Sequence, residues 1–301
     1  MAAQSFVLLE DRAVLAVSGA DRRAFLQGLV SNDVLKVGPA RALHAALLTP
    51  QGKYLHDFFM VEEGEAIGLD SAAERLSDLR RRLLLYRLRA KAAIEERPDL
   101  AVAAVFGEDA PDAFGLEAEP GAARAFAGGT AFVDPRLSAL GVRLILPRPV
   151  LRPALLELGL AEADPALYDR HRLLLGVPDG SRDLVTEKSI LLEAGFDELN
   201  GIDWQKGCYL GQELTARTKY RGLLKRRLVP VAIAGPAPPV GAIVTLGGRE
   251  VGEMRSSRLD RGIAFLRIDA ILAEKPLAAG EAALRVMRPS SMRLEPGSES
   301  G

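Results

Sequence analysis

The sequence predicts an α+β protein whose last part is a small all-β domain. In the N-terminal three quarters, segments with the apolar alternation of strands are interspersed with segments that repeat at helical spacing. From 228 to 288, short Val, Ile and Leu runs are instead separated by Gly and Pro about every ten residues, which is typical of a small β-barrel or sandwich. Because 301 residues exceed the usual size of one hydrophobic core, we expect two or more domains.

The first expected elements are two short strands and a helix. The segment VLLEDRAVLAVSG predicts two strands joined by a turn at Glu10-Asp11, and a helix that opens near Ser18 to Asp21 carries Phe25, Leu26 and Leu29 on one side. After a turn at 31–33, ALHAALLTPQGKYLHDFFMVEE predicts two strands around the Pro50-Gln51-Gly52 turn.

The middle of the chain predicts further helices and strands. Apolar residues at helical spacing predict a helix over 71–85, and alternating basic and apolar residues predict a half-exposed strand over 87–92. Residues 107–130 are rich in Gly, Ala, Pro and acidic groups and indicate a surface connection with one short helix. We then expect a strand at 141–146, helices at 151–158 and 168–175, and a disordered tail at 289–301.

Composition limits the classes of function. The 39 basic and 40 acidic side chains balance, so nothing global indicates binding to nucleic acid or a membrane. The first 26 residues lack the layout of a signal peptide because charged residues at 10–12 interrupt the apolar stretch. A single cysteine excludes an intrachain disulfide and fits a reducing compartment, so we expect a cytoplasmic protein.

The single cysteine, Cys208, lies in the segment KGCYLGQELTAR, residues 206–217. A lone cysteine is commonly a small buried apolar residue. Here, however, Lys206 lies two residues upstream, and the sequence after Gly211 could open a helix with its positive end near the sulfur. Both features lower a thiol pKa and favour the reactive thiolate.

Three chemistries are open to Cys208. A cysteine hydrolase needs a histidine base, and His44, His56 and His171 are all distant in sequence. A self-contained zinc or iron-sulfur site needs several ligands, which one cysteine and three scattered histidines do not provide, so we expect no stably bound metal. The third option is an exposed thiol that acts on something carried by a partner.

A basic run, RTKYRGLLKRR, follows at 217–227, with six basic residues and no acid. It is either a solvated face or a site for an anion. Aromatic residues for stacking on bases are sparse, so a small polyanion such as a polyglutamylated cofactor fits better than nucleic acid. Guanidinium groups such as that of Arg217 hold carboxylates in bidentate fashion.

The segment KGCYLGQE followed by LTAR, preceded by Gly201, Asp203 and Trp204, resembles the signature of the YgfZ-type folate-binding proteins. Its continuation TKYRGLLKRRLVPV resembles the branch that includes mitochondrial iron-sulfur assembly factors. FLQGLVSNDV, LLTPQGKYLHDFF and RLLLGVPDG leading into LLEAGFDELNG match that family in order, so the resemblance covers most of the chain.

The family is similar in fold to the aminomethyltransferase T protein of the glycine cleavage system. The resemblance therefore implies an α+β, T-protein-like multi-domain fold with a C-terminal β-barrel. The implied divisions are a folate-binding region of two interleaved α+β units at 1–225, the barrel at 226–288 and the tail at 289–301.

The resemblance also implies a tetrahydrofolate pocket. By motif position, Glu193 would hold the pterin ring, Arg217 the glutamyl carboxylate, and the turn of Asn32 and Asp33 would line the pocket. Asp57 matches a T-protein aspartate near the folate nitrogen, but the T protein has paired aspartates where this chain has His56 and Asp57. The T protein also lacks the cysteine motif, which implies a different task for Cys208.

These implications yield three hypotheses. The first is a tetrahydrofolate-binding factor for the assembly or repair of iron-sulfur proteins, in which Cys208, activated by Lys206, engages a cluster or a partner. Its partners would be folate and iron-sulfur client or carrier proteins. The second is a folate-dependent one-carbon transferase with Asp57 as the polar catalytic group. The third is a folate-binding regulator without chemistry.

Overall fold

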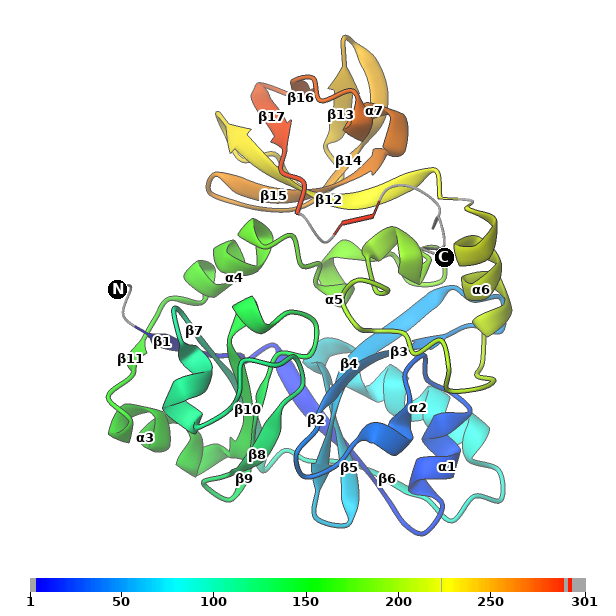
Figure 1. The fold of residues 1–301 in the computed structure, drawn as a ribbon, viewed down its shortest axis with the longest axis vertical. Coiled ribbons are helices and arrows are strands. Elements are labelled where there is room, and N and C mark those ends of the chain that lie inside the picture. Colours follow the sequence, from blue (N-terminus) through cyan, green and yellow to red (C-terminus); the bar gives the residue numbers. More distant parts are fainter. Residues whose placement is uncertain (1–3, 223, 290–291, 294–301) are drawn as a thin grey trace. The chain divides into compact units, whose positions relative to one another are not determined.

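The computed structural model describes residues 4–222, 224–289 and 292–293. The chain forms two compact units, and Figure 1 shows their elements. Unit 1 consists of Met1–Leu48, Leu55–Tyr168 and Asn200–Leu210, and unit 2 of Thr49–Tyr54, Asp169–Leu199 and Gly211–Gly301.

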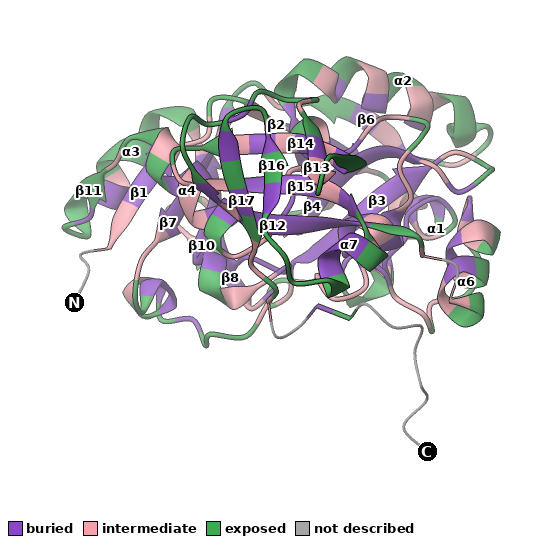
Figure 2. Cartoon of the chain, turned by 90° about the horizontal axis from the view of Figure 1, so that it is seen from above, coloured by how far each residue is buried: buried purple, intermediate pink, exposed green. Residues whose placement is uncertain are grey.

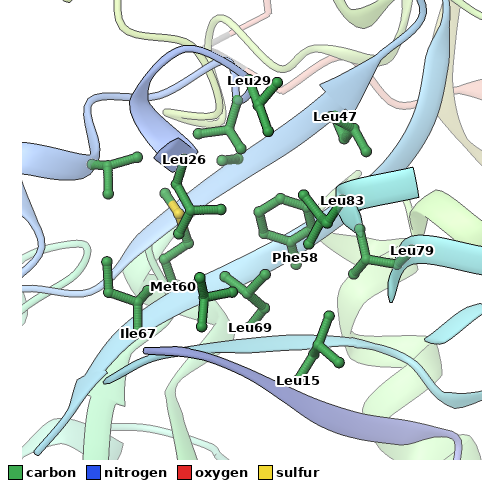
Figure 3. Packing of buried hydrophobic residues seen from close by; sticks show 14 of the residues in the cluster. Leu15, Leu26, Leu29, Leu47, Phe58, Met60, Ile67, Leu69, Leu79 and Leu83 are labelled. Atoms are coloured by element: carbon green, nitrogen blue, oxygen red, sulfur yellow. The ribbon is translucent and has the colours of Figure 1, made fainter. Parts of the chain in front are cut away.

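Unit 1 contains a five-stranded sheet in the order β3-β4-β5-β2-β6. Along β4, Phe58 and Met60 lie on one face, where they meet Leu26 of helix α1 and Leu83 of helix α2 (Figure 3). Phe59, between them, belongs to a different apolar cluster. The elements are β2 (Arg12–Ser18), α1 (Arg22–Gln27), β3 (Leu43–Leu48), β4 (Tyr54–Glu63), β5 (Ala66–Ala72), α2 (Leu76–Arg87) and β6 (Ala93–Glu96).

A six-stranded sheet of unit 1 has the order β11-β1-β7-β10-β9-β8. Helix α3 contributes Leu151 and Leu155 to its core. The elements are β1 (Ser5–Leu8), β7 (Leu100–Phe106), β8 (Ala123–Phe126), β9 (Gly129–Val133), β10 (Val142–Pro147), α3 (Arg148–Glu157) and β11 (Ala161–Glu162). The two predicted N-terminal strands both form, but β1 enters this sheet and β2 the five-stranded one.

Unit 2 contains a closed barrel in the order β12-β15-β14-β13-β16-β17. Buried and exposed residues alternate along β16 and β17, as expected where one face lines the barrel interior (Figure 2). The strands are β12 (Arg226–Ala234), β13 (Ile243–Leu246), β14 (Arg249–Arg258), β15 (Arg261–Arg267), β16 (Leu277–Ala279) and β17 (Ala282–Val286).

Short helices complete unit 2. Arg172 donates to Asp183 at 2.8 Å and to Ser256 of β14 at 3.2 Å, so buried polar bonds join the helical part of this unit to the barrel. The helices are α4 (Pro165–Leu174), which begins in unit 1, α5 (Gly180–Asp183), α6 (Gln212–Arg221) and α7 (Ile268–Leu272). Single 3-10 turns occur in both units as η1 (Val34–Lys36), η2 (Ala73–Arg75), η3 (Ala110–Phe114), η4 (Ser138–Leu140) and η5 (Leu191–Ala194).

Three predicted elements are wrong in part. The helix expected from 71 begins at Leu76, because residues 66–72 pair with β2 as β5. The strand expected at 87–92 lies instead at 93–96, since α2 continues through Arg87 and β6 pairs with β2 only from Ala93. The connection at 107–130 contains the expected short helix, but β8 and the start of β9 also form a hairpin there.

The other predicted elements form within a few residues of the expected bounds, including the hairpin of β3 and β4 and the helix after Gly211. The predicted domain limits at residues 225 and 288 stay a prediction. Of the predicted tail, residues 290–291 and 294–301 lie outside the described residues. Within the described part of the chain, no helix is long and apolar enough to cross a membrane.

Candidate functional site

Residues 200–210 belong to unit 1 and include the first part of the cysteine motif. We call them the motif segment. Of the predicted site residues, unit 1 also contains Asn32, Asp33 and Asp57, whereas Glu193 and Arg217 belong to unit 2. The structure thus brings Lys206 and Cys208 into the same unit as the Asn32-Asp33 turn. A single site that combines residues of both units stays a prediction.

Asn32 is a buried junction between the predicted turn and the motif segment. Its amide donates to the carbonyls of His44 at 2.8 Å and Asn200 at 2.7 Å, and its side-chain oxygen accepts the backbone N–H of Asp33. Both amide hydrogens are therefore used, and only one acceptor lone pair is left for a ligand. Asp33 accepts from the backbone N–H of Leu35 and caps η1.

Lys206 binds the end of helix α1. Its Nζ donates to the carbonyl oxygens of Gln27 and Asn32, each at 2.8 Å, and also to that of Val30. An ammonium has three N–H donors, so these carbonyls use all of them. The ammonium therefore satisfies the carbonyl at the last residue of α1 and two carbonyls in the turn that follows.

Burial lowers the pKa of Lys206 to about 8, although Asp33 and Asp203 favour the charged form. The sequence suggested that Lys206 activates the thiol, and this stays a prediction. Its contacts give Lys206 another role, which is to fix the motif segment. The backbone N–H of Leu210 also donates to Gly28 at 3.0 Å, so the segment is bound to the end of α1 on both sides of the cysteine.

Cys208 is exposed and forms no disulfide. It is therefore not the buried apolar residue that lone cysteines commonly are. His44 and His56 are buried and contact the carboxylates of Asp57 and Asp78, at 3.2 and 2.9 Å respectively. These contacts give no support to a cysteine hydrolase. Among the described residues, no group of three or more His, Cys, Asp or Glu could hold a metal ion.

Asp57 lies on β4 and is buried. Burial lowers the pKa of His44 despite the adjacent Asp57, so the imidazole is neutral at pH 7. Phe59 lies on the same strand, and three guanidinium groups lie near its ring. That of Arg143 is the nearest, at 4.2 Å from the ring centroid. Asp70 pairs with two of them, Arg12 at 2.7 Å and Arg143 at 2.6 Å.

An open cavity of about 500 Å³ lies in unit 1 beside Asn32 and the motif segment. Its rim carries two ion pairs, Lys36 with Asp203 at 2.5 Å and Arg41 with Glu119 at 2.6 Å. Sequence reasoning had not assigned most of these residues a role, because they come from separate segments. The lining residues are Asn32, Lys36, Arg41, Ala42, Leu43, Glu119, Pro120, Pro135, Asn200, Ile202, Asp203, Trp204 and Gln205.

In unit 2, Glu193 lies in η5 and is half-buried. Burial raises the pKa of its carboxyl, and the Ile190 backbone N–H and the charges of Lys53, Arg226 and Arg255 oppose this effect in part. Arg217 is exposed on α6.

The basic run at 217–227 does not form one uniform face. Arg227 is buried, donates to the carbonyl of Leu192 and pairs with Glu198 at 2.8 Å, so it has a structural role. Lys225 and Arg226 are exposed.

The architecture defines a class of protein, the aminomethyltransferase T fold. The crystal structure of the glycine cleavage system aminomethyltransferase T from Bartonella henselae matches with a TM-score of 0.79, covering 98% of this chain and 87% of that one. At 13% identity this likeness concerns the fold alone. Residues 225–294 match the C-terminal β-barrel domain of CAF17. The predicted T-protein-like α+β fold with a C-terminal barrel is confirmed.

Curated relatives identify the family within that class. The chain is 35% identical over 293 residues to the mitochondrial iron-sulfur cluster assembly factor IBA57 of Homo sapiens, covering 91% of this chain and 81% of the relative. It is 33% identical to the IBA57 of Mus musculus, over 92% of this chain and 81% of the relative. The chain belongs to the IBA57 family of iron-sulfur cluster assembly factors.

The expectation of a cytoplasmic protein is wrong, because the curated relatives are mitochondrial proteins. The first 26 residues and the single cysteine exclude only a secretory signal and an intrachain disulfide. Neither feature separates the cytoplasm from the interior of another reducing compartment.

Proposed function

We propose that this protein is a tetrahydrofolate-binding factor for the assembly or repair of iron-sulfur proteins. The observation that carries the proposal is the open cavity of unit 1, which lies beside the segment that presents Cys208. Its volume of about 500 Å³ suits a ligand of folate size, since small-molecule sites typically measure roughly 300–1,000 Å³.

The lining of the cavity is chemically compatible with folate. Trp204, Ile202 and two prolines offer apolar surface for a flat heterocycle. Glutamyl carboxylates would bind the rim cations Lys36 and Arg41 by sharing or replacing their present partners, Asp203 and Glu119. With one free lone pair, Asn32 accepts at most one ligand hydrogen bond and otherwise positions the motif segment. When bound, tetrahydrofolate would supply a nitrogen that carries one-carbon units.

Glu193 and Arg217 remain proposed folate ligands by resemblance. The half-buried carboxyl of Glu193 supports this role, because burial penalises its charged form and N–H donors of a pterin would offset that penalty. Arg217 is exposed and able to bind a carboxylate.

The role proposed for Cys208 is to ligate or transfer an iron-sulfur cluster, which is cargo rather than a resident cofactor. One thiolate cannot hold a cluster alone, so a client or carrier protein would supply the other ligands. The exposure of Cys208 and the anchoring of residues on both sides of it support this role. The names of the curated relatives, which are iron-sulfur cluster assembly factors, agree with it.

A one-carbon transferase is the weaker alternative. It would require Asp57 at the reacting group, but Asp57 is buried against His44 and is not among the residues that line the cavity. We therefore assign Asp57 a positioning role within unit 1.

Calorimetric titration of tetrahydrofolate tests the proposal. We expect saturable binding to the wild-type protein and to Cys208→Ala, and at least tenfold weaker binding to Trp204→Ala and Glu193→Ala, the loss expected when one good contact is removed. Binding unaffected by Trp204→Ala would place folate elsewhere. No binding to the wild-type protein would refute the folate function and leave the thiol function to be tested by cluster transfer from a loaded carrier protein.

A further inference from the structure

The C-terminal end of α2 and the turn after it, residues 80–91, carry six basic residues and no acidic one. We propose that this region, the α2 basic surface, binds an acidic segment of a protein partner that also carries apolar side chains. The proposal does not depend on folate binding. The surface consists of Arg80, Arg81, Leu85, Tyr86, Arg87, Leu88, Arg89 and Lys91.

The apolar part of this surface has no role in the core. Leu85 is 64% exposed, Tyr86 37% and Leu88 86%. The apolar stripe that holds α2 on its sheet is a different one, formed by Leu79 and Leu83 with Leu76. Figure 2 shows exposed residues along the outer side of α2. Three exposed large apolar side chains within four residues are typical of a contact site rather than of scattered surface residues.

Leu88 is also held in an unfavourable backbone conformation. It lies directly after the last residue of α2 with φ 42° and ψ −109°, where helices commonly have glycine. A bulky residue at positive φ is strained, and the exposed side chain gains no burial in return. The fold would be served at least as well by glycine, so the leucine serves something outside the chain.

The charges on this surface are only partly neutralised. Arg81 and Arg82 pair with Asp78, and Arg80 donates to the carbonyl of Ile94. In the described part of the chain, no carboxylate pairs with the three cations that follow, Arg87, Arg89 and Lys91. These positive charges flank the exposed leucine, so the complementary ligand combines carboxylates with an apolar anchor.

A protein segment fits this surface better than a lipid bilayer does. Interfacial helices insert a long apolar face into the membrane, whereas the apolar stripe of α2 is already used in the core. The apolar side chains that remain exposed lie at the C-terminal end of the helix. A patch of this kind suits a few anchor residues of a peptide.

The test uses a fluorescent helical peptide of glutamate and leucine, measured by anisotropy against the full-length protein. A peptide with serine in place of leucine is the matched probe. We expect saturable binding of the first peptide, and at least tenfold weaker binding of the serine peptide. Arg87→Glu with Arg89→Glu should weaken binding at least tenfold. Arg148→Glu with Arg152→Glu, an exposed pair elsewhere in unit 1 whose members already pair with carboxylates, should not.

Leu88→Gly separates binding from folding. It removes the anchor and relieves the positive φ, so we expect weaker peptide binding with an unchanged or higher melting temperature. Peptide binding unchanged in Leu88→Gly and in the Arg87 and Arg89 variant would overturn the proposal. So would absence of saturable peptide binding, or binding only to vesicles of anionic phospholipid or to an oligonucleotide. Tetrahydrofolate titration of the same variants should be unchanged, which keeps this test distinct from that of the proposed function.

Discussion

Replacing Lys206 by methionine should destabilise unit 1 and loosen the segment that carries Cys208. The substitution keeps most of the side-chain volume but removes the donors to the carbonyls of Gln27, Val30 and Asn32. Val30 is fully buried and Asn32 nearly so, and a buried acceptor without a partner costs about 1–3 kcal/mol. Because Lys206 is only half-buried, water can reach part of the site, and we expect a net loss of about 2 kcal/mol in the free energy of unfolding.

Urea denaturation followed by tryptophan fluorescence measures this loss, since Trp204 is the only tryptophan and lies two residues from Lys206. Lys36→Met is the control, because Lys36 forms an exposed ion pair with Asp203 that contributes at most about 1 kcal/mol. If Lys206→Met were no less stable than Lys36→Met, the anchoring role of Lys206 would be refuted.

The pH dependence gives a second result from the same variants. The pKa of Lys206 falls from 10.5 to about 8 on folding, so between these values the unfolded chain binds more protons than the folded one. The contribution of Lys206 to stability therefore rises with pH across this window. The stability difference between wild type and Lys206→Met should be larger at pH 10 than at pH 7, and a smaller difference would show that folding does not lower the pKa of Lys206.

Three further predictions concern other parts of the chain. Asp70→Ala should cost about 3–5 kcal/mol in urea denaturation, because it leaves the buried guanidinium of Arg143 and the partly buried one of Arg12 without their carboxylate; a loss below 1 kcal/mol would show that water solvates both groups. Cys208→Ser should leave the melting temperature unchanged, since the side chain is exposed. In cells that lack the protein, the variant should fail to restore the activity of iron-sulfur enzymes, and full restoration would refute the role of the thiol. Charge reversal at Lys225 and Arg226 should weaken binding of a carrier protein more than binding of monoglutamyl folate, and equal losses would show that this basic pair does not serve a partner.

Local pattern sufficed for elements whose partners are near in sequence. The sequence around Pro50 predicted the two strands of its hairpin, and the Val, Ile and Leu runs predicted the strands of the barrel. In both cases the alternation of apolar and polar residues indicates which face of a strand is buried. The same alternation at Arg87 to Ala92 failed. There α2 extends to Arg87, and pairing with β2, far away in the chain, sets the position of β6. Likewise, nothing local shows that β1 and β2 enter different sheets.

The candidate site was predictable only where function leaves a side-chain signature. The motif around Cys208 and the turn at Asn32 were identified from residue types. The contacts of Lys206 were not, because its acceptors are backbone carbonyls 174 to 179 residues away, and a carbonyl carries no information about residue type. The electrostatic effect of Lys206 on the thiol of Cys208 was expected from the sequence and stays a prediction, whereas the structure shows the ammonium donating to three backbone carbonyls.

This placement of Lys206 links the two proposed activities through one residue. The backbone carbonyl of Asn32 accepts from Lys206, and Asn32 also lines the cavity, while only Gly207 separates Lys206 from Cys208. A ligand that orders the Asn32 turn would therefore also order the segment that presents the thiol, without touching the sulfur. If so, tetrahydrofolate should slow alkylation of Cys208 by iodoacetamide in the wild-type protein but not in Lys206→Met. Equal slowing in both proteins would mean that the ligand covers the thiol directly, and the anchoring lysine would then have no part in coupling folate to cluster handling.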